Sequence, residues 1–156
     1  MLKHIVTSLL LLALFAMPSP AHMAPFEDFP VTSAFGWRVH PISGEWKFHA
    51  GVDLGYQEGD PVPALFDGVV VQCGDFGDGY GNQVLLYHPY LDSYTRYAHL
   101  SSVWVSASME IPAGTVIGCV GATGYVTGPH LHLEYIPPTG DGSYVYTNPL
   151  VLWGLA

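Results

Sequence analysis

The sequence predicts an all-β fold, a compact and mostly antiparallel β domain with short loops and little helix after an N-terminal signal peptide. Three observations predict it. From Val31 onward the chain is interrupted by Gly or Pro every few residues. The apolar runs between these interruptions are short and rich in Val, Tyr, Leu and Ile, which favour strands. Beyond residue 21 no segment keeps a 3.6-residue apolar period, so the pattern does not favour helices.

Residues 1–21 are predicted to be a cleaved secretory signal. Lys3 gives a positive start, residues 5–17 are almost wholly apolar, and Ser19 and Ala21 are small residues where a signal peptidase acts. A transmembrane anchor is the alternative, but this run is shorter than the about 20 residues that cross a bilayer. We therefore expect export to the periplasm or the cell exterior and no membrane contact after cleavage. An N-terminal arm over 22–32 and one folded domain over 33–156 are expected to follow.

Five segments of this domain are predicted to be strands because they are short, apolar and bounded by turn residues. In the third of them, the period of two puts Arg96 on one face and Thr95 and Tyr97 on the other. The five segments are residues 68–73, 83–88, 93–98, 115–121 and 130–136.

The composition limits the partners of the mature chain. After removal of the signal, 135 residues remain, enough for one domain with a core and too few for two. Three basic residues stand against 13 acidic ones, so the formal charge is −10 with histidine neutral. This balance disfavours nucleic acid and anionic membranes as partners. We expect a monomer whose acidic surface serves solubility.

Cys73 and Cys119 are the only cysteines. In an exported protein such a pair can form a disulfide, which would stabilise the fold by about 4 kcal/mol in the chain-entropy model. The alternative is two buried free thiols that act as small apolar residues of strands. The sequence favours neither.

Two separated segments carry residues that suit a metal site, HAGVDLG at 49–55 and GPHLHLEY at 128–135. Together they supply two histidines and an aspartate for one zinc ion, with a further histidine beside it. Three ligands with an open coordination position describe a catalytic zinc, whereas four ligands usually close a structural one.

His49 and Asp53 are four residues apart, and taken alone this pair is more typical of a surface turn. Gly51 and Gly55 favour a strand or tight turn that aims both side chains at one point, because glycine tolerates the backbone geometry of such a turn.

The alternation around His132 is stronger evidence. In a strand, His130, His132 and Glu134 share one face, while Leu131 and Leu133 take the other. Two imidazoles and a carboxylate on one face are costly in a core and suit a polar cleft. Glu134 has two interpretations: it fixes the tautomer of a ligand imidazole by a hydrogen bond, or it is a solvated charge at a strand end.

The other histidines are less informative. His99 directly follows the strand predicted over 93–98, which is compatible with a site but does not require one. His40 and His88 each precede proline and are predicted to be structural. His22 would become the mature N-terminus, and with the free amine it gives a minor hypothesis of copper binding.

Four aromatic residues near the motifs also have two interpretations. They line a substrate groove, or they belong to the core, which is the more frequent place for aromatics in a small β domain. These residues are Trp37, Trp46, Tyr80 and Tyr125.

The chain resembles the lysostaphin/LytM-type family of zinc endopeptidases, which cut peptide bonds in bacterial peptidoglycan. The resemblance runs from SAFGWRVHPISGEWKFHAGVDLG through YGNQVLLYHPYLDSYTRYAHLSS to VIGCVGATGYVTGPHLHLEY, about residues 33–136. Three separate motifs in the family's order thus cover nearly the whole mature domain. The resemblance implies a compact antiparallel β fold with a long groove across the active site.

Carried over residue by residue, the resemblance implies that His49, Asp53 and His132 bind one Zn²⁺ per chain. It implies that His130 is a catalytic histidine and that His99 is its partner.

The resemblance also bears on residues outside the ligand set. Arg38, in the entry segment 33–41, has an implied structural part. The stretch 106–112 departs from the family pattern, because Ala107, Ser108 and Met109 stand where glycine is common. This departure concerns a turn and not the site.

The implied function is an exported zinc metallo-endopeptidase whose partners are peptidoglycan peptides and which hydrolyses their cross-links or cross-bridges. The alternative is a non-catalytic cell-wall-binding regulator of amidases, because some relatives in this family have lost the metal site. All five of the residues carried over are present here, which favours the enzyme. The bond that is cut, and the histidine that acts as the base, stay open at this stage.

Overall fold

The computed structural model describes residues 30–156. The predicted signal peptide, His22 and most of the predicted arm lie outside these residues. Among the described residues, no helix is both long and apolar enough to cross a bilayer.

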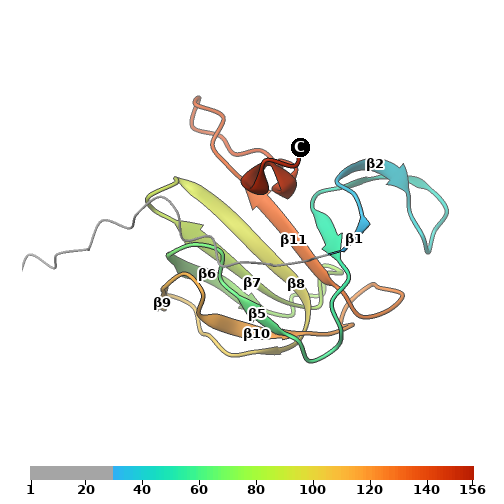
Figure 1. Ribbon diagram of the computed structural model, residues 1–156, viewed down its shortest axis with the longest axis horizontal. Helices are drawn as coiled ribbons and strands as arrows, with labels where there is room; N and C mark the ends of the chain where they lie inside the picture. Colours follow the sequence, from blue (N-terminus) through green and yellow to red (C-terminus); the bar gives the residue numbers. More distant parts are fainter. Residues whose placement is uncertain (1–29) are drawn as a thin grey trace, which may run out of the picture.

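One large sheet dominates the molecule, and all of its strand pairs are antiparallel. Its main path runs in the order β1-β4-β11-β8-β7-β6-β9, and β10 joins β5 to β8 beside this path (Figure 1). The strands are β1 (Val31–Ser33), β4 (Val52–Leu54), β5 (Pro61–Pro63), β6 (Gly68–Gly74), β7 (Asn82–His88), β8 (Ser93–Val103), β9 (Glu110–Ile111), β10 (Val116–Val120) and β11 (Leu131–Ile136).

The prediction of a mostly antiparallel all-β domain is therefore confirmed. The five predicted strands correspond to β6, β7, β8, β10 and β11, with β8 extending five residues beyond its predicted end. The remaining strands contain only two to four residues each, too few to show an alternating pattern. A short 3₁₀ helix, η1 (Pro149–Trp153), is the one helix in the described part of the chain.

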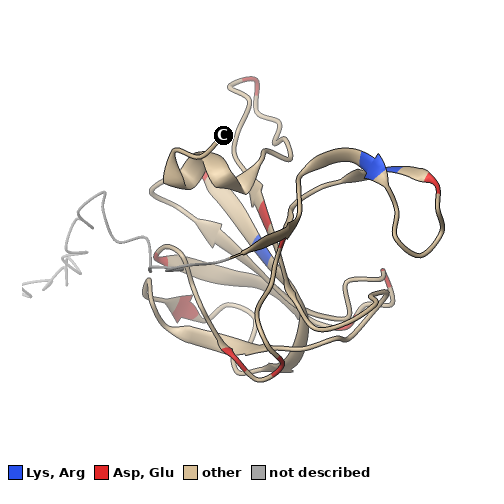
Figure 2. Ribbon diagram, turned by 45° about the vertical axis from the view of Figure 1, so that its right-hand side comes forward, with Lys and Arg blue, Asp and Glu red and all other residues tan. Residues whose placement is uncertain are grey.

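A second, two-stranded sheet stands apart from the first. Strands β2 (Gly36–Val39) and β3 (Trp46–His49) form a hairpin that projects from the main sheet (Figures 1 and 2). Figure 2 shows basic residues on this hairpin and on a central strand, while acidic residues are spread mainly over turns and loops. The hairpin ends at His49, whose imidazole reaches β4 and β11 of the main sheet.

The apolar core lies against one face of the central strands. Leu131 and Leu133 of β11 and Tyr97 and Leu100 of β8 are fully buried in it. The predicted alternation of β11 is confirmed, because these leucines enter the core while His132 and Glu134 occupy the opposite face.

Cys73 and Cys119 are free thiols in the structure, so the disulfide alternative does not hold there. Cys73 lies in β6 and Cys119 in β10, and these two strands are not neighbours in the sheet. The Cys73 thiol instead donates to the Val105 carbonyl oxygen at 3.5 Å. Both side chains are only partly buried.

Candidate metal centre

Three strands deliver the residues of the site. Asp53 of β4 and His132 of β11 are direct cross-strand partners, so their side chains stand side by side on the face opposite the core. His49 ends β3 and enters from the hairpin. The cluster therefore combines two neighbours in the main sheet with one residue from the second sheet.

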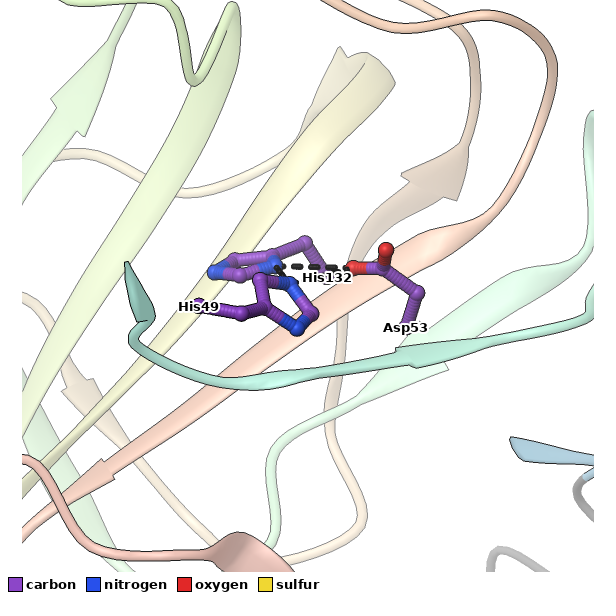
Figure 3. Close-up of side chains that lie close together, drawn as sticks. All are labelled: His49, Asp53 and His132. Carbon is purple, nitrogen blue, oxygen red and sulfur yellow. Dashed lines mark hydrogen bonds and ion pairs between the residues drawn. The ribbon is translucent and has the colours of Figure 1, made fainter. Parts of the chain in front are cut away.

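The side chains of these residues converge on one point, as Figure 3 shows. His132 Nδ1 lies 2.9 Å from Asp53 Oδ1 and 3.0 Å from His49 Nε2. His49 Nε2 lies 3.1 Å from Asp53 Oδ1. Together they are a group of residues that can offer ligand atoms to one metal ion.

The partners behind each imidazole fix which nitrogen carries the proton. His49 Nδ1 lies 2.8 Å from the Ala34 carbonyl oxygen, which can only accept, so in the neutral ring Nδ1 carries the hydrogen. His132 Nε2 faces Glu134 Oε1 at 3.1 Å and carries the hydrogen for the same reason. Hence His49 Nε2, His132 Nδ1 and an Asp53 oxygen point three lone pairs at one place. A cation satisfies this arrangement, and the donor set suits zinc.

The linker between His49 and Asp53 requires glycine for its lack of a side chain. A Cβ at Gly51 would lie 2.2 Å from the Leu133 carbonyl oxygen, so the linker passes directly against β11. Gly51 does not have a left-handed backbone, and neither does Gly55. The sequence argument from backbone geometry was therefore wrong at these positions: close approach, not conformation, requires the glycine.

Glu134 is fully buried behind His132 and is held by two further side chains. Tyr80 donates its hydroxyl to Glu134 Oε1 at 2.6 Å, and Arg96 Nη1 lies 3.3 Å from Oε2. The Arg96 guanidinium also lies over the Tyr80 ring, 4.4 Å from its centroid. Of the two interpretations of Glu134, the structure has the hydrogen bond to the imidazole, not the solvated charge.

Asp53 is placed among positive and hydrogen-bonding groups. Burial alone would raise the pKa of its carboxyl, but the hydrogen bonds to His132 and His49 outweigh burial and hold the pKa well below its ordinary value. Arg38 Nη2 stands 3.7 Å from Asp53 Oδ2, on the side away from the imidazoles. Asp53 is thus ionised at neutral pH, as a metal ligand must be.

His99 and His130 stand side by side next to this cluster, with ring centroids 4.9 Å apart. His99 Nδ1 lies 2.9 Å from the Thr123 carbonyl oxygen, and His130 Nδ1 lies 2.9 Å from that of Gly128. Each ring therefore keeps its hydrogen on Nδ1 and leaves the Nε2 lone pair free. Burial, and next the neighbouring His132 and His130, lower the pKa of His99 to about 4, so it is neutral at neutral pH.

A distortion in β8 turns His99 toward the site. Thr95 and Tyr97 are buried on the core side, so simple alternation would send His99 there too. Instead His99 has a left-handed backbone, with φ of 63°, and the next residue, Leu100, takes the core position. The pairing of β8 with β7 also shifts register here, between Tyr97 and Leu100. A bulge of this kind re-aims a side chain at a cost in backbone strain.

The cluster lies in an open groove with a volume of about 610 Å³. His40 and Tyr125 stack across part of this groove with ring centroids 5.5 Å apart. His40 also accepts the backbone N–H groups of Ile42 and Ser43, in keeping with its predicted structural role. The groove residues that bear on the chemistry are Arg38, Lys47, Asp78, Tyr80, His99 and His130.

All five residues carried over from the resemblance meet in this groove. The sequence did not predict that Arg96 and Tyr80 would contact Glu134 behind the site. For Arg96 the strand pattern held a clue, because the face of β8 predicted for Arg96 is the face that carries the site. Of the four aromatics, Tyr80 and Tyr125 line the groove, whereas Trp37 and Trp46 lie neither in the groove nor in the core.

Comparison with known proteins supports this description. Residues 47–145 match peptidase family M23. The DD-carboxypeptidase/endopeptidase Mpg of Neisseria meningitidis is 46% identical over 104 residues, covering 67% of this chain and 24% of that protein. The peptidoglycan DD-endopeptidase ShyC of Vibrio cholerae is 37% identical over 123 residues, covering 78% and 28%. The chain thus spans about a quarter of the length of these relatives.

Solved structures share the fold. The catalytic domain of the antimicrobial peptidase lysostaphin from Staphylococcus simulans superposes with a TM-score of 0.71 at 31% identity, covering 81% of this chain and 92% of that one. A zinc-containing peptidase from Vibrio cholerae gives a TM-score of 0.64 at 33% identity, covering 75% and 35%.

Proposed function

The chain belongs to peptidase family M23, and from that membership we propose that it is an exported zinc endopeptidase that hydrolyses peptide cross-links or cross-bridges of bacterial peptidoglycan. The observation that carries the proposal is the convergence of three lone pairs beside the imidazoles of His99 and His130 in an open groove. The relative named as a peptidoglycan DD-endopeptidase, ShyC of Vibrio cholerae, supports the substrate class.

We assign the zinc ligands as His49 Nε2, Asp53 Oδ1 and His132 Nδ1, one ion per chain. Bound zinc supplies Lewis acidity, which polarises the scissile carbonyl group and lowers the pKa of water. The protein holds the ligands in their binding tautomers through Ala34 and Glu134. Arg38 balances the second oxygen of Asp53.

His99 and His130 carry the proton transfers. Their free Nε2 atoms accept a proton from the attacking water, stabilise the developing oxyanion once protonated, and return a proton to the leaving amine. Both rings are fixed by carbonyl oxygens at Nδ1, so neither needs to reorient between these steps. His130 Nε2 also lies 3.5 Å from Asp53 Oδ1, so this ring stands directly beside the ligand cluster.

The remaining parts of the proposal come from the sequence. Residues 1–21 direct export and are removed, the domain over 33–156 acts in the periplasm or outside the cell, and the mature protein works as a monomer without nucleic-acid or membrane partners. A regulator without catalysis does not need to keep five converging metal and proton-transfer residues, so this site favours the enzyme.

The test compares two histidine variants of the mature protein. His132→Ala is expected to lose both zinc and hydrolysis. His99→Ala is expected to keep about one zinc and to lose turnover by about 10²–10⁴-fold, the usual contribution of a general acid or base. Zinc is measured by atomic emission, and hydrolysis by mass spectrometry of fragments released from several purified peptidoglycans. A His99→Ala protein that cleaves at the normal rate contradicts the assigned role.

A further inference from the structure

The two faces of the β2–β3 hairpin differ in chemistry. Trp37 pairs with Phe48 and Val39 with Trp46, so these four residues share one face, because alternate residues of a strand do. Arg38 and Lys47 pair on the other face, and there Arg38 reaches Asp53 of the metal centre. We call the four-residue face the aromatic strip.

The aromatic strip is open to solvent. Trp37 is 70% exposed, Trp46 68%, Val39 57% and Phe48 44%. From the sizes of these side chains the strip presents on the order of 500 Å² of surface. Contiguous exposed apolar patches of this size on soluble proteins are often binding sites. The Trp37 and Phe48 rings pack edge to face at 5.8 Å, which holds the strip in one shape.

We propose that the aromatic strip binds the sugar rings of the neutral glycan chain to which the substrate peptide is attached. The inference rests on the proposed function, since a peptidoglycan peptide enters the groove with its glycan chain beside it. The strip then acts as a second binding site for the same polymer, beside the groove.

The position of the aromatic strip supports binding of the glycan chain. Val39 and Phe48 belong both to the strip and to the lining of the groove, so the two surfaces are continuous. Phe48 directly precedes His49, which offers a ligand atom to the metal centre. A polymer whose peptide lies at the metal centre therefore passes next to the strip without any change in the fold.

The chemistry of the aromatic strip also supports a neutral glycan chain as its occupant. Aromatic rings offer an apolar face for the C–H face of a sugar, and each indole adds an N–H donor for a hydroxyl group. No member of the strip is charged, and the chain carries a net charge of −9, so anionic polymers and anionic membranes are poor occupants. A second copy of the chain is also a poor occupant, because a stable dimer buries about 800 Å² on each partner.

The first experiment measures sugar binding directly. The mature protein is titrated with neutral N-acetylglucosamine oligosaccharides, which offer sugar rings without carboxylates, and binding is followed by the shifts of backbone amide NMR signals. We expect weak saturable binding, with Kd on the order of 1 mM. Binding should be lost in the Trp37→Ala/Trp46→Ala double variant. Trp104→Ala is the matched control, because Trp104 is 59% exposed but lies outside the strip.

The second experiment separates polymer binding from catalysis. The double variant is expected to cleave intact peptidoglycan about tenfold more slowly at low substrate, because it has lost a second site on the polymer. Its rate on a soluble cross-linked peptide without sugars should stay unchanged, and Trp104→Ala should behave as the wild type on both substrates. Thermal melting confirms that the variants are folded.

Several outcomes would overturn the inference. These are no glycan binding by the wild type, unchanged cleavage of intact peptidoglycan by the double variant, strip-dependent self-association in sedimentation, or strip-dependent binding to phospholipid vesicles. A wild type that binds the oligosaccharides but cleaves neither substrate refutes the proposed function instead, so the two failures are distinguishable.

Discussion

Strand β11 has two faces that are equally buried but are built on opposite principles. Leu131 and Leu133 are buried among apolar neighbours, and any residue of similar shape and polarity would serve there. His132 and Glu134 are as well buried, yet each depends on named polar partners from other strands. The difference teaches that burial alone specifies the core face, whereas the site face exists only when several strands are in register.

The largest effect expected on the core face comes from Leu133→Ala. Removing this fully buried side chain leaves a cavity and should cost about 2–5 kcal/mol of unfolding free energy. Zinc affinity of the folded protein should stay near that of the wild type, because no ligand loses a partner. Chemical denaturation and zinc titration below the unfolding transition measure the two quantities. A large loss of zinc affinity would show that the faces are not independent.

On the site face, Glu134→Gln should lower both the unfolding free energy and the zinc affinity. It leaves Arg96 without its buried counter-ion, which should cost about 3 kcal/mol in stability. It also weakens the acceptor for His132 Nε2, which should lower zinc affinity about 10–100-fold.

A double variant, Glu134→Gln/Arg96→Met, sharpens this comparison. Removing the unpaired charge should restore part of the stability, whereas the zinc affinity should remain low. Recovery of both together would mean that Glu134 acts on the metal only through the stability of the fold.

The core face contains a series of hydrogen-bonded polar groups, and all of them are uncharged. The Leu65 N–H donates to the Tyr97 hydroxyl oxygen, which is 3.1 Å from the Thr95 hydroxyl oxygen. His88 Nε2 is 2.7 Å from that threonine oxygen, and its Nδ1 is 2.9 Å from the Asp67 carbonyl oxygen. All partners are satisfied when His88 is neutral, with its hydrogen on Nδ1.

This neutrality predicts a dependence on pH. Burial lowers the pKa of His88 below its ordinary value and outweighs the hydrogen bond to Asp67, which raises it. Above about pH 6.5 the folded and unfolded forms are both neutral. As the pH falls below that value, the unfolded chain binds the proton first, so stability declines by up to about 1.4 kcal/mol per pH unit until the folded pKa is reached.

The variant His88→Gln tests whether His88 causes the loss of stability at low pH. At pH 7.5 it should lower the unfolding free energy by about 1–2 kcal/mol, because a buried hydrogen-bonding group is altered. The additional loss that the wild type shows between pH 6.5 and lower pH should be smaller in the variant. Urea denaturation of both proteins over this range gives the difference, and equal slopes would mean that other groups cause the acid sensitivity.

The smallest effect is expected at a turn that belongs to neither face. Ser108 has a left-handed backbone, with φ of 70°, within the stretch 106–112 where the resemblance to the family implies glycine. The turn is kept, with Met109 N–H donating to the Ser106 carbonyl oxygen at 3.2 Å. Ser108→Gly should therefore stabilise the protein by about 0.5–1 kcal/mol without changing zinc affinity. A destabilised variant would contradict a strained serine.

Sequence patterns were sufficient where a segment was long enough to show its period. The alternation of β11 predicted both the core leucines and the polar face, and the same reasoning assigned Thr95 and Tyr97 to one side of β8. Sequence patterns were insufficient for the β2–β3 hairpin, because its strands have only four residues each. The positions of Trp37 and Trp46 were not predicted, because the two interpretations considered were the groove and the core, and neither includes an exposed face outside the groove.

The amino-acid sequence by itself determined the all-β class, the alternation that separates core from cleft, and the residue types suited to zinc, because these depend on local pattern and side-chain chemistry. Only the tertiary structure decided which atoms face one another. The register of β4 with β11 sets Asp53 beside His132, and the bulge in β8 turns His99 from the core to the cleft. The approach of Gly51 to β11 brings His49 within reach of both. Each of these depends on contacts between strands far apart in the chain, which no local pattern encodes.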